Sequence, residues 1–94
     1  MSALLDKIKT GAMVVDVRTV EEFEEEHYPR AVNIPVDQVH LRLADFGDKQ
    51  HPIIVYCASG SRSAYAAKIL KAAGFTRVRR AAETPFNIVL EARP

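Results

Sequence analysis

The residues best suited to chemistry lie in one short loop around Cys57, the only cysteine of the chain. A β-branched apolar run at 53–56 precedes it, small and polar residues follow at 58–63, and a helix-forming run begins at Ala64. A strand, a tight loop and a helix N-terminus in this order aim successive backbone N–H groups into one concavity, where the helix dipole also favours negative charge. We therefore predict that Cys57 is held there as a reactive thiolate.

The loop offers the hydrogen-bond donors and the positive charge that a thiolate site needs. An unperturbed thiol has a pKa near ~8.5, so only a few per cent of it is thiolate at pH 7. Hydrogen bonds to a charged group contribute roughly 1.5–3 kcal/mol each, and one pKa unit is about 1.4 kcal/mol, so two well-aimed amides would suffice. Gly60 allows a positive φ in the turn. The planar guanidinium of Arg62 can donate to loop carbonyls and attract an anionic substrate. Three hydroxyls are further donors, although each could equally be an ordinary turn or cap residue: Ser59, Ser61 and Ser63.

Short apolar runs and amphipathic segments alternate along the rest of the chain. Helical segments are predicted at residues 2–9, after Thr19, at 36–46 and at 64–73, with Gly11 and Gly74 ending the first and the last. This alternation predicts an α/β fold with a mostly parallel sheet of four to five strands and helices on both faces. Strands are predicted at 12–15, 31–34, 53–56 and around Val78.

A capping box predicts how the helix after the first strand begins. The Thr19 hydroxyl and the Glu22 carboxylate can each reach the backbone amide of the other, and we expect Val20 and Phe23 to form the buried edge of the helix. The glutamates at 21–26 could dock to a basic partner. A solvated helix face, acidic near its N-terminus as the dipole favours, explains them more simply.

The first and third apolar runs are both followed by residues with charged or nucleophilic side chains. Asp16-Val17-Arg18 follows the first run and Cys57 follows the third. Because ligands of parallel sheets bind at the carboxyl ends of the strands, we expect these two sites to meet in space.

Three stretches of the chain resemble the single-domain rhodanese sulfurtransferases. Cys57 to Ser63 matches the C-x-x-G-x-R-S loop of that family, and Gly74-Phe75 followed by Val78 matches its G-F-x-x-V turn. The segment from Asp16 to Pro35 matches its D-V-R…E-F…H-x-P-x-A-x-N-I-P pattern, with Glu26 and Arg30 at two positions that are usually glycine. The resemblance covers roughly residues 12–78.

The resemblance implies a rhodanese-like fold in a single domain, 1–94, and a persulfide mechanism. Cys57 would take the outer sulfur of thiosulfate or a similar small anionic donor and pass it to cyanide or a thiol, a protein acceptor being a further candidate. Arg62 would share the catalytic role, and Asp16 and Arg18 would form a structural polar pair behind the loop. The remaining loop residues would bind substrate: Ala58, Ser59, Gly60, Ser61 and Ser63.

The composition of the chain excludes several other classes of function. Thirteen basic and twelve acidic side chains in 94 residues give a net charge of +1, which argues against general nucleic-acid binding. One cysteine cannot form an internal disulfide, and three scattered histidines predict no metal site; no cofactor is indicated either. With no signal peptide pattern and no run of ~20 apolar residues, we expect a cytoplasmic protein that does not span a membrane.

Two alternatives remain open at the level of sequence. Cysteine phosphatases use C-x5-R, whereas only four residues separate Cys57 from Arg62, so phosphatase chemistry is disfavoured. A rhodanese-like binding module or sulfur carrier, acting on a protein partner with little free turnover, is the stronger rival. Three arginines near the end of the motif region either face solvent or border the pocket and attract anionic donors: Arg77, Arg79 and Arg80.

Overall fold

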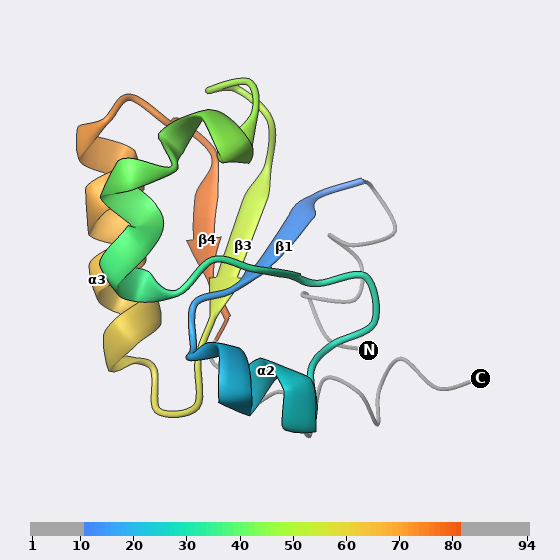
Figure 1. Ribbon diagram of the computed structural model, residues 1–94. Coiled ribbons are helices and arrows are strands. Elements are labelled where there is room, and N and C mark those ends of the chain that lie inside the picture. Colours follow the sequence, from blue (N-terminus) through green and yellow to red (C-terminus); the bar gives the residue numbers. More distant parts are fainter. Residues whose placement is uncertain (1–10, 82–94) are drawn as a thin grey trace.

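A parallel β-sheet forms the centre of the molecule. The computed structural model describes residues 11–81, and in them four strands pair in the order β2-β1-β3-β4 (Figure 1). This arrangement confirms the predicted α/β class, with β1 and β3, whose side chains are almost entirely buried, in the middle. The strands are β1 (Met13–Asp16), β2 (Val32–Asn33), β3 (Ile53–Tyr56) and β4 (Val78–Arg80), and all their pairings are parallel.

Helices lie against one side of this sheet and near its carboxyl edge. α3 (Ser61–Ala72) and two 3₁₀ helices, η1 (Val36–Leu41) and η2 (Leu43–Phe46), stand on one side, whereas α2 (Val20–Glu25) lies near the carboxyl ends of the strands (Figure 1). Because the strands are parallel, the loops after β1 and β3 emerge at the same edge, next to α2 and to the start of α3.

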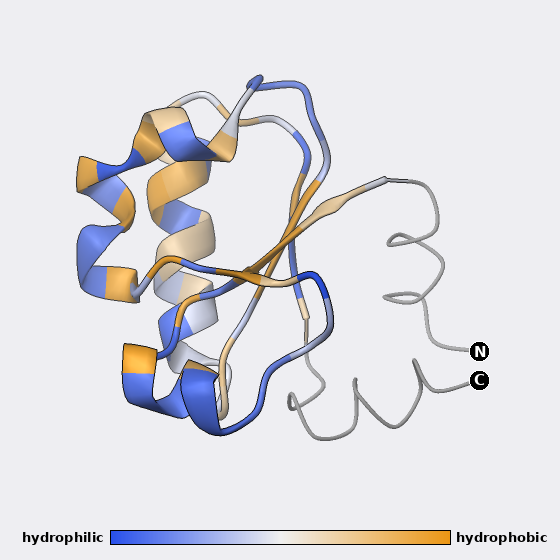
Figure 2. Cartoon of the chain, turned by 45° about the vertical axis from the view of Figure 1, so that its right-hand side comes forward, coloured by the Kyte–Doolittle hydropathy of each residue, from blue (hydrophilic) through white to orange (hydrophobic). Residues whose placement is uncertain are grey.

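Two clusters of buried side chains pack on the two faces of the sheet. Successive residues of β3 alternate between them, as the period of two in a strand requires: Ile53 and Val55 face one cluster, and Ile54 and Tyr56 the other. The first cluster contains buried residues of α3, η1 and η2, including Leu70, Val39 and Phe46. The second contains Val14, Tyr28 and Ala81. Figure 2 shows the hydrophobic colouring concentrated on the central strands.

The helical segment predicted for residues 36–46 differs from the structure. It consists of two 3₁₀ helices that meet at Arg42, where φ of −124° and ψ of 36° leave the helical region. Val39 and Phe46 are fully buried there. A 3₁₀ helix has three residues per turn, so it also places apolar residues three apart on one face, and the spacing alone does not separate it from an α-helix.

The helix α2 begins as predicted but buries less than predicted. The Thr19 hydroxyl accepts a hydrogen bond from the Glu22 amide at 3.2 Å, and the Glu22 carboxylate accepts one from the Thr19 amide at 3.1 Å, which confirms the capping box. Val20 is 47% exposed, so its expected place on a buried edge is wrong. Phe23 is half-buried and stacks on His27 with ring centroids 3.7 Å apart. A helix of six residues at the end of a sheet has little surface to pack against.

Arg30 has a backbone conformation that favours glycine, the usual residue at this position of the sequence pattern that the segment from Asp16 to Pro35 resembles. Its φ is +72°, in the left-handed region, which costs an L-residue about 1 kcal/mol.

The predicted helix at 2–9 and the C-terminal residues 82–94 lie outside the described residues. None of the helices in 11–81 is long and apolar enough to cross a membrane.

Candidate functional site

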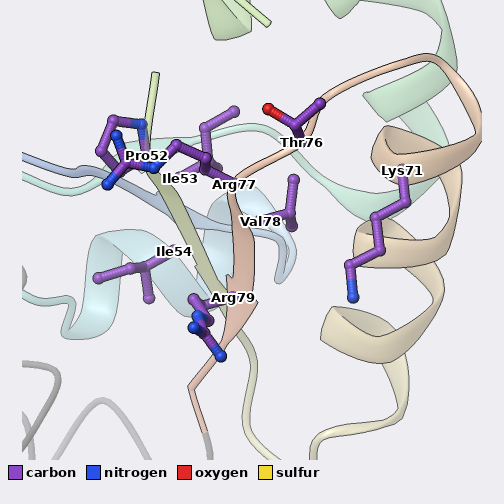
Figure 3. Close-up of a pocket in the computed structure, with 8 residues that line it drawn as sticks. All are labelled: Pro52, Ile53, Ile54, Lys71, Thr76, Arg77, Val78 and Arg79. Carbon is purple, nitrogen blue, oxygen red and sulfur yellow. The ribbon is translucent and has the colours of Figure 1, made fainter. Parts of the chain in front are cut away.

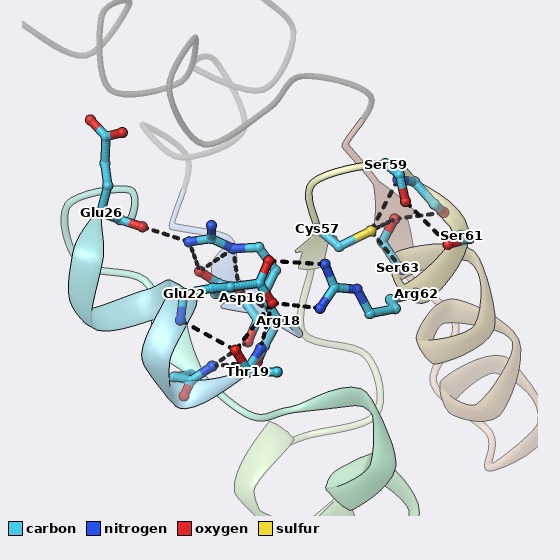
Figure 4. A network of polar contacts seen from close by, with 12 residues as sticks. Asp16, Arg18, Thr19, Glu22, Glu26, Cys57, Ser59, Ser61, Arg62 and Ser63 are labelled. Atoms are coloured by element: carbon cyan, nitrogen blue, oxygen red, sulfur yellow. Dashed lines mark hydrogen bonds and ion pairs between the residues drawn. The ribbon is translucent and has the colours of Figure 1, made fainter.

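The site is built where β3 ends and α3 begins. β3 ends at Tyr56, Cys57 follows it, and the chain turns through Gly60, whose φ of +92° glycine adopts without strain, into the first turn of α3. This turn directs two backbone amides at the sulfur: Gly60 N lies 3.0 Å and Ser63 N 3.2 Å from Cys57 Sγ (Figure 4). The expected inward orientation of the loop amides is confirmed.

The Ser63 hydroxyl completes the surroundings of the sulfur. Its Oγ lies 3.5 Å from Cys57 Sγ and 3.1 Å from the carbonyl oxygen of Gly60. While the thiol is protonated, it can donate to Ser63 Oγ and the hydroxyl can donate to the Gly60 carbonyl. Once the thiol is ionised, the same hydroxyl proton can turn to the sulfur instead.

These contacts lower the pKa of Cys57. Burial raises the pKa of the thiol, but hydrogen bonds from the Ser63 side chain and from the amides of Ser63, Gly60 and Ser59 outweigh it. The pKa of Cys57 therefore lies below its ordinary value, which is the direction that the sequence analysis predicts.

Arg62 has a partner that the sequence analysis did not identify. Its guanidinium does not turn to loop carbonyls as expected; Nη1 and Nη2 instead donate to the two carboxylate oxygens of Glu22, at 2.6 and 3.1 Å (Figure 4). The pair also lowers the pKa of Glu22 to about 2, first through the hydrogen bond from Arg62 and next through the Thr19 amide. Glu22 thus caps α2 and holds the loop arginine, which corrects its interpretation as part of a solvated face.

Asp16 and Arg18 form a buried ion pair at the end of β1. Arg18 Nη2 lies 2.7 Å from Asp16 Oδ2, and the Asp16 side chain is fully buried. The same Arg18 nitrogen donates to the carbonyl of Glu26 at 2.5 Å, and the guanidinium lies 5.8 Å from the centre of the Tyr56 ring. Asn33 donates to the carbonyls of both members of the pair, at 3.0 and 3.1 Å. The pair therefore links β1 to β2, β3 and the end of α2.

The expected meeting of the two strand ends is confirmed. Asp16 pairs in register with Tyr56, the residue before Cys57, and the Val17 amide donates to the Tyr56 carbonyl at 3.1 Å. Glu22 and Asn33 are the residues that sequence reasoning missed at this edge. The capping box could have signalled Glu22, because it fixes that carboxylate in the first turn of a helix that starts at the same edge as the cysteine loop.

A cavity of about 340 Å³ opens over the loop, lined by Ser59, Gly60, Ser61, Arg80 and Ala81. Cys57 itself is 2% exposed and is not among the residues that line this cavity. Another cavity, of about 330 Å³, lies toward the start of β3 and β4, between Pro52, Lys71 and Arg79 (Figure 3). It is lined by other residues than those of the cysteine loop.

Within residues 11–81, no cluster of three or more histidine, cysteine or acidic side chains could hold a metal ion.

Sequence comparison finds similar proteins in two bacteria. The thiosulfate sulfurtransferase PspE of Escherichia coli is 40% identical over 68 residues, which cover 71% of this chain and 65% of PspE. The putative sulfur carrier protein YrkF of Bacillus subtilis is 38% identical over 65 residues, 69% of this chain and 35% of YrkF. The chain thus spans less than two thirds of the length of these curated relatives.

A solved structure and a family model extend the match over most of the chain. The human single-domain sulfurtransferase TSTD1 superposes with a TM-score of 0.82 at 26% identity, covering 97% of this chain and 92% of that one. The model of the rhodanese-like domain matches residues 1–82. The chain belongs to the rhodanese-like domain family.

Proposed function

We propose that this protein is a sulfurtransferase that moves a sulfane sulfur from thiosulfate, or a similar small anionic donor, to a thiol or cyanide through a persulfide on Cys57. The observation that best supports the proposal is the pair of loop amides, Gly60 N and Ser63 N, directed at Cys57 Sγ at 3.0 and 3.2 Å. They favour a thiolate nucleophile, and they would favour the negative charge of a persulfide in the same way.

The reaction balances without an oxidant or a cofactor. The Cys57 thiolate attacks the outer sulfur of thiosulfate, a new S–S bond forms, and the bond between the two donor sulfurs breaks with its electron pair leaving on sulfite. An acceptor thiolate or cyanide then attacks the outer sulfur of the persulfide and regenerates the Cys57 thiolate. No proton transfer is required in the first step, so no general base is needed.

The other residues of the site have supporting roles in this proposal. Arg62, held by Glu22, would keep the first turn of α3 and its amides in place. The buried pair of Asp16 and Arg18 would keep the neighbouring strand end rigid. The loop residues proposed to bind the donor and the persulfide are Ala58, Ser59, Gly60, Ser61 and Ser63.

Mass spectrometry tests the proposal directly. After incubation with thiosulfate, the wild-type chain should gain the mass of one sulfur atom on Cys57, and addition of cyanide should remove it and yield thiocyanate. Cys57→Ser should show neither change, because a hydroxyl at that position is not ionised at neutral pH. A wild-type protein that gains no sulfur from thiosulfate, mercaptopyruvate or a protein persulfide would contradict the proposal.

A sulfur carrier or binding module is the second candidate function. It is favoured by the low exposure of Cys57, 2%, which restricts collisions with free donors, and by the similarity to YrkF, a putative sulfur carrier. Comparing turnover of thiosulfate with transfer from a protein persulfide separates the two functions. Fast loading by a protein donor with very slow thiosulfate turnover would favour the carrier.

A further inference from the structure

Arg62, the arginine of the cysteine loop, is not available to bind the sulfur donor. Both terminal nitrogens of Arg62 are hydrogen-bonded to the carboxylate of Glu22, which offsets its charge and occupies the fork that would otherwise bind an anion. The donor of the proposed reaction is a dianion, so its negative group needs another partner at the mouth of the site.

Arg80 is placed to be that partner. It is the last residue of β4 and pairs in register with Val55, two residues before Cys57, so it lies at the same edge of the sheet as the cysteine loop. Together with Ser59, Gly60 and Ser61 it lines the 340 Å³ cavity over that loop. Its side chain is exposed, and no acidic residue within 11–81 pairs with it, in contrast to Arg18, Arg42 and Arg62.

The part of the sequence that carries the cysteine loop and Arg80 is basic. Residues 49–81 contain no aspartate or glutamate, and of their basic side chains only Arg62 has an ion-pair partner within the described residues, Glu22. A cluster of one sign raises the local concentration of oppositely charged ligands. The basic residues of this stretch are Lys49, Arg62, Lys68, Lys71, Arg77, Arg79 and Arg80.

We propose that Arg80 binds the anionic group of the sulfur donor and thereby selects doubly charged donors. The inference rests on the proposed sulfurtransferase function and adds the residue that binds the charged group of the donor. The sulfonate end of thiosulfate lies against the Arg80 guanidinium in the cavity, and the outer sulfur is directed into the loop toward Cys57. When the S–S bond of the donor breaks, Arg80 remains paired with the departing sulfite, which is also a dianion.

Steady-state kinetics with two donors test this role. Thiosulfate carries two negative charges, and methanethiosulfonate carries the same transferable sulfur with one charge. For Arg80→Gln at low ionic strength we expect the KM for thiosulfate to rise about tenfold with kcat changed less than twofold, because a charge-assisted hydrogen bond is lost in binding. The KM for methanethiosulfonate should rise about threefold or less, and Arg80→Lys should retain most of the thiosulfate affinity.

Arg79→Gln is the matched control. It removes the same charge from the neighbouring residue, whose side chain points to the opposite face of β4 and lines the separate cavity of Figure 3. Its KM for thiosulfate should stay within about twofold of the wild type. Equal effects of the two variants, or an equal effect of Arg80→Gln on both donors, overturns the proposal. A wild-type chain that acquires no sulfur from either donor instead refutes the sulfurtransferase function on which it rests.

Discussion

At Cys57, burial and hydrogen bonding act on the thiol in opposite directions. A sulfur that is almost completely covered would ordinarily be kept protonated, and it is the convergence of one hydroxyl and the loop amides that reverses this effect. Each of these donors is worth roughly 1.5–3 kcal/mol to a charged acceptor, so the loss of one should be measurable.

Ser63→Ala tests this balance at a single residue. The change removes the hydroxyl 3.5 Å from Sγ and leaves the backbone amide of residue 63, so we expect the pKa of Cys57 to rise. Persulfide formation from thiosulfate at neutral pH should slow by roughly tenfold, and the rate should recover as the pH is raised. The measurement is the pH profile of the loading rate.

Ser63→Thr is the conservative control, because it keeps the hydroxyl. Its profile should stay close to that of the wild type. A profile of Ser63→Ala that is lowered equally at all pH values would show that the hydroxyl acts on the shape of the loop rather than on the ionisation of Cys57.

At the scale of the elements, the short helix α2 is tied to the cysteine loop by Glu22. This carboxylate caps its own helix through Thr19 and binds Arg62 at the start of α3, forty residues further along the chain. None of the residues of α2 is buried, so polar contacts replace the apolar packing that normally fixes a helix to a sheet.

Glu22→Gln should make stability less dependent on pH. The folded-state pKa of Glu22 is about 2 and its ordinary value 4.5, so the ionised carboxylate stabilises the fold above about pH 4.5 and this contribution is lost as the pH falls toward 2. Both side chains of the pair are about one third exposed (31% and 33%), so after solvent screening we expect a loss of only about 1 kcal/mol at pH 7.

Denaturant unfolding of wild type and Glu22→Gln at pH 7, 5 and 3 measures this contribution. The difference in unfolding free energy should be largest at pH 7 and shrink toward zero as the acid range is entered. Glu21→Gln, which removes an exposed charge from the same turn of α2, should differ from the wild type by less at pH 7. A difference for Glu22→Gln that does not change between pH 7 and pH 3 would contradict the assignment.

At the scale of the whole molecule, the buried pair of Asp16 and Arg18 joins segments that are distant in the sequence. Its hydrogen bonds reach the end of α2 and the Asn33 side chain of β2, and Arg18 lies over the ring of Tyr56 on β3. Burial raises the pKa of the Tyr56 hydroxyl, which accepts a hydrogen bond from the Tyr28 amide. The carboxyl edge of the sheet is therefore held by one connected polar network.

Asp16→Asn should destabilise the protein strongly. It leaves the Arg18 guanidinium, whose side chain is 9% exposed, without its counter-charge, and the loss of one member of a buried pair costs about 3–5 kcal/mol. Asp45→Asn, which breaks the exposed pair with Arg42, is the matched control and should cost less than about 1 kcal/mol. Chemical unfolding of both variants gives the comparison, and similar losses would show that burial does not strengthen the first pair.

The sequence predicted the elements whose signals are local. Apolar runs located β1 and β3, the Thr19 capping box located the start of α2, and the residue types around Gly60 indicated a loop that turns its amides toward Cys57. Local patterns were weaker for residues 36–46, because a spacing of three or four fits both 3₁₀ and α-helical turns. They also gave no measure of how little of α2 the sheet would cover.

What the sequence by itself determined is thus the α/β class, the strand–loop–helix unit around Cys57 and the inward direction of its loop amides, all of which follow from residue types within a few positions of one another. The tertiary structure alone decided that Glu22 forms an ion pair with Arg62 and that the Asn33 side chain donates to the backbone at the end of β1. It also decided that Arg80, and not Arg79, lines the cavity over the loop. Each of these depends on residues far apart in the chain. The parallel strand order brings them to one edge of the sheet, and no local pattern encodes that proximity.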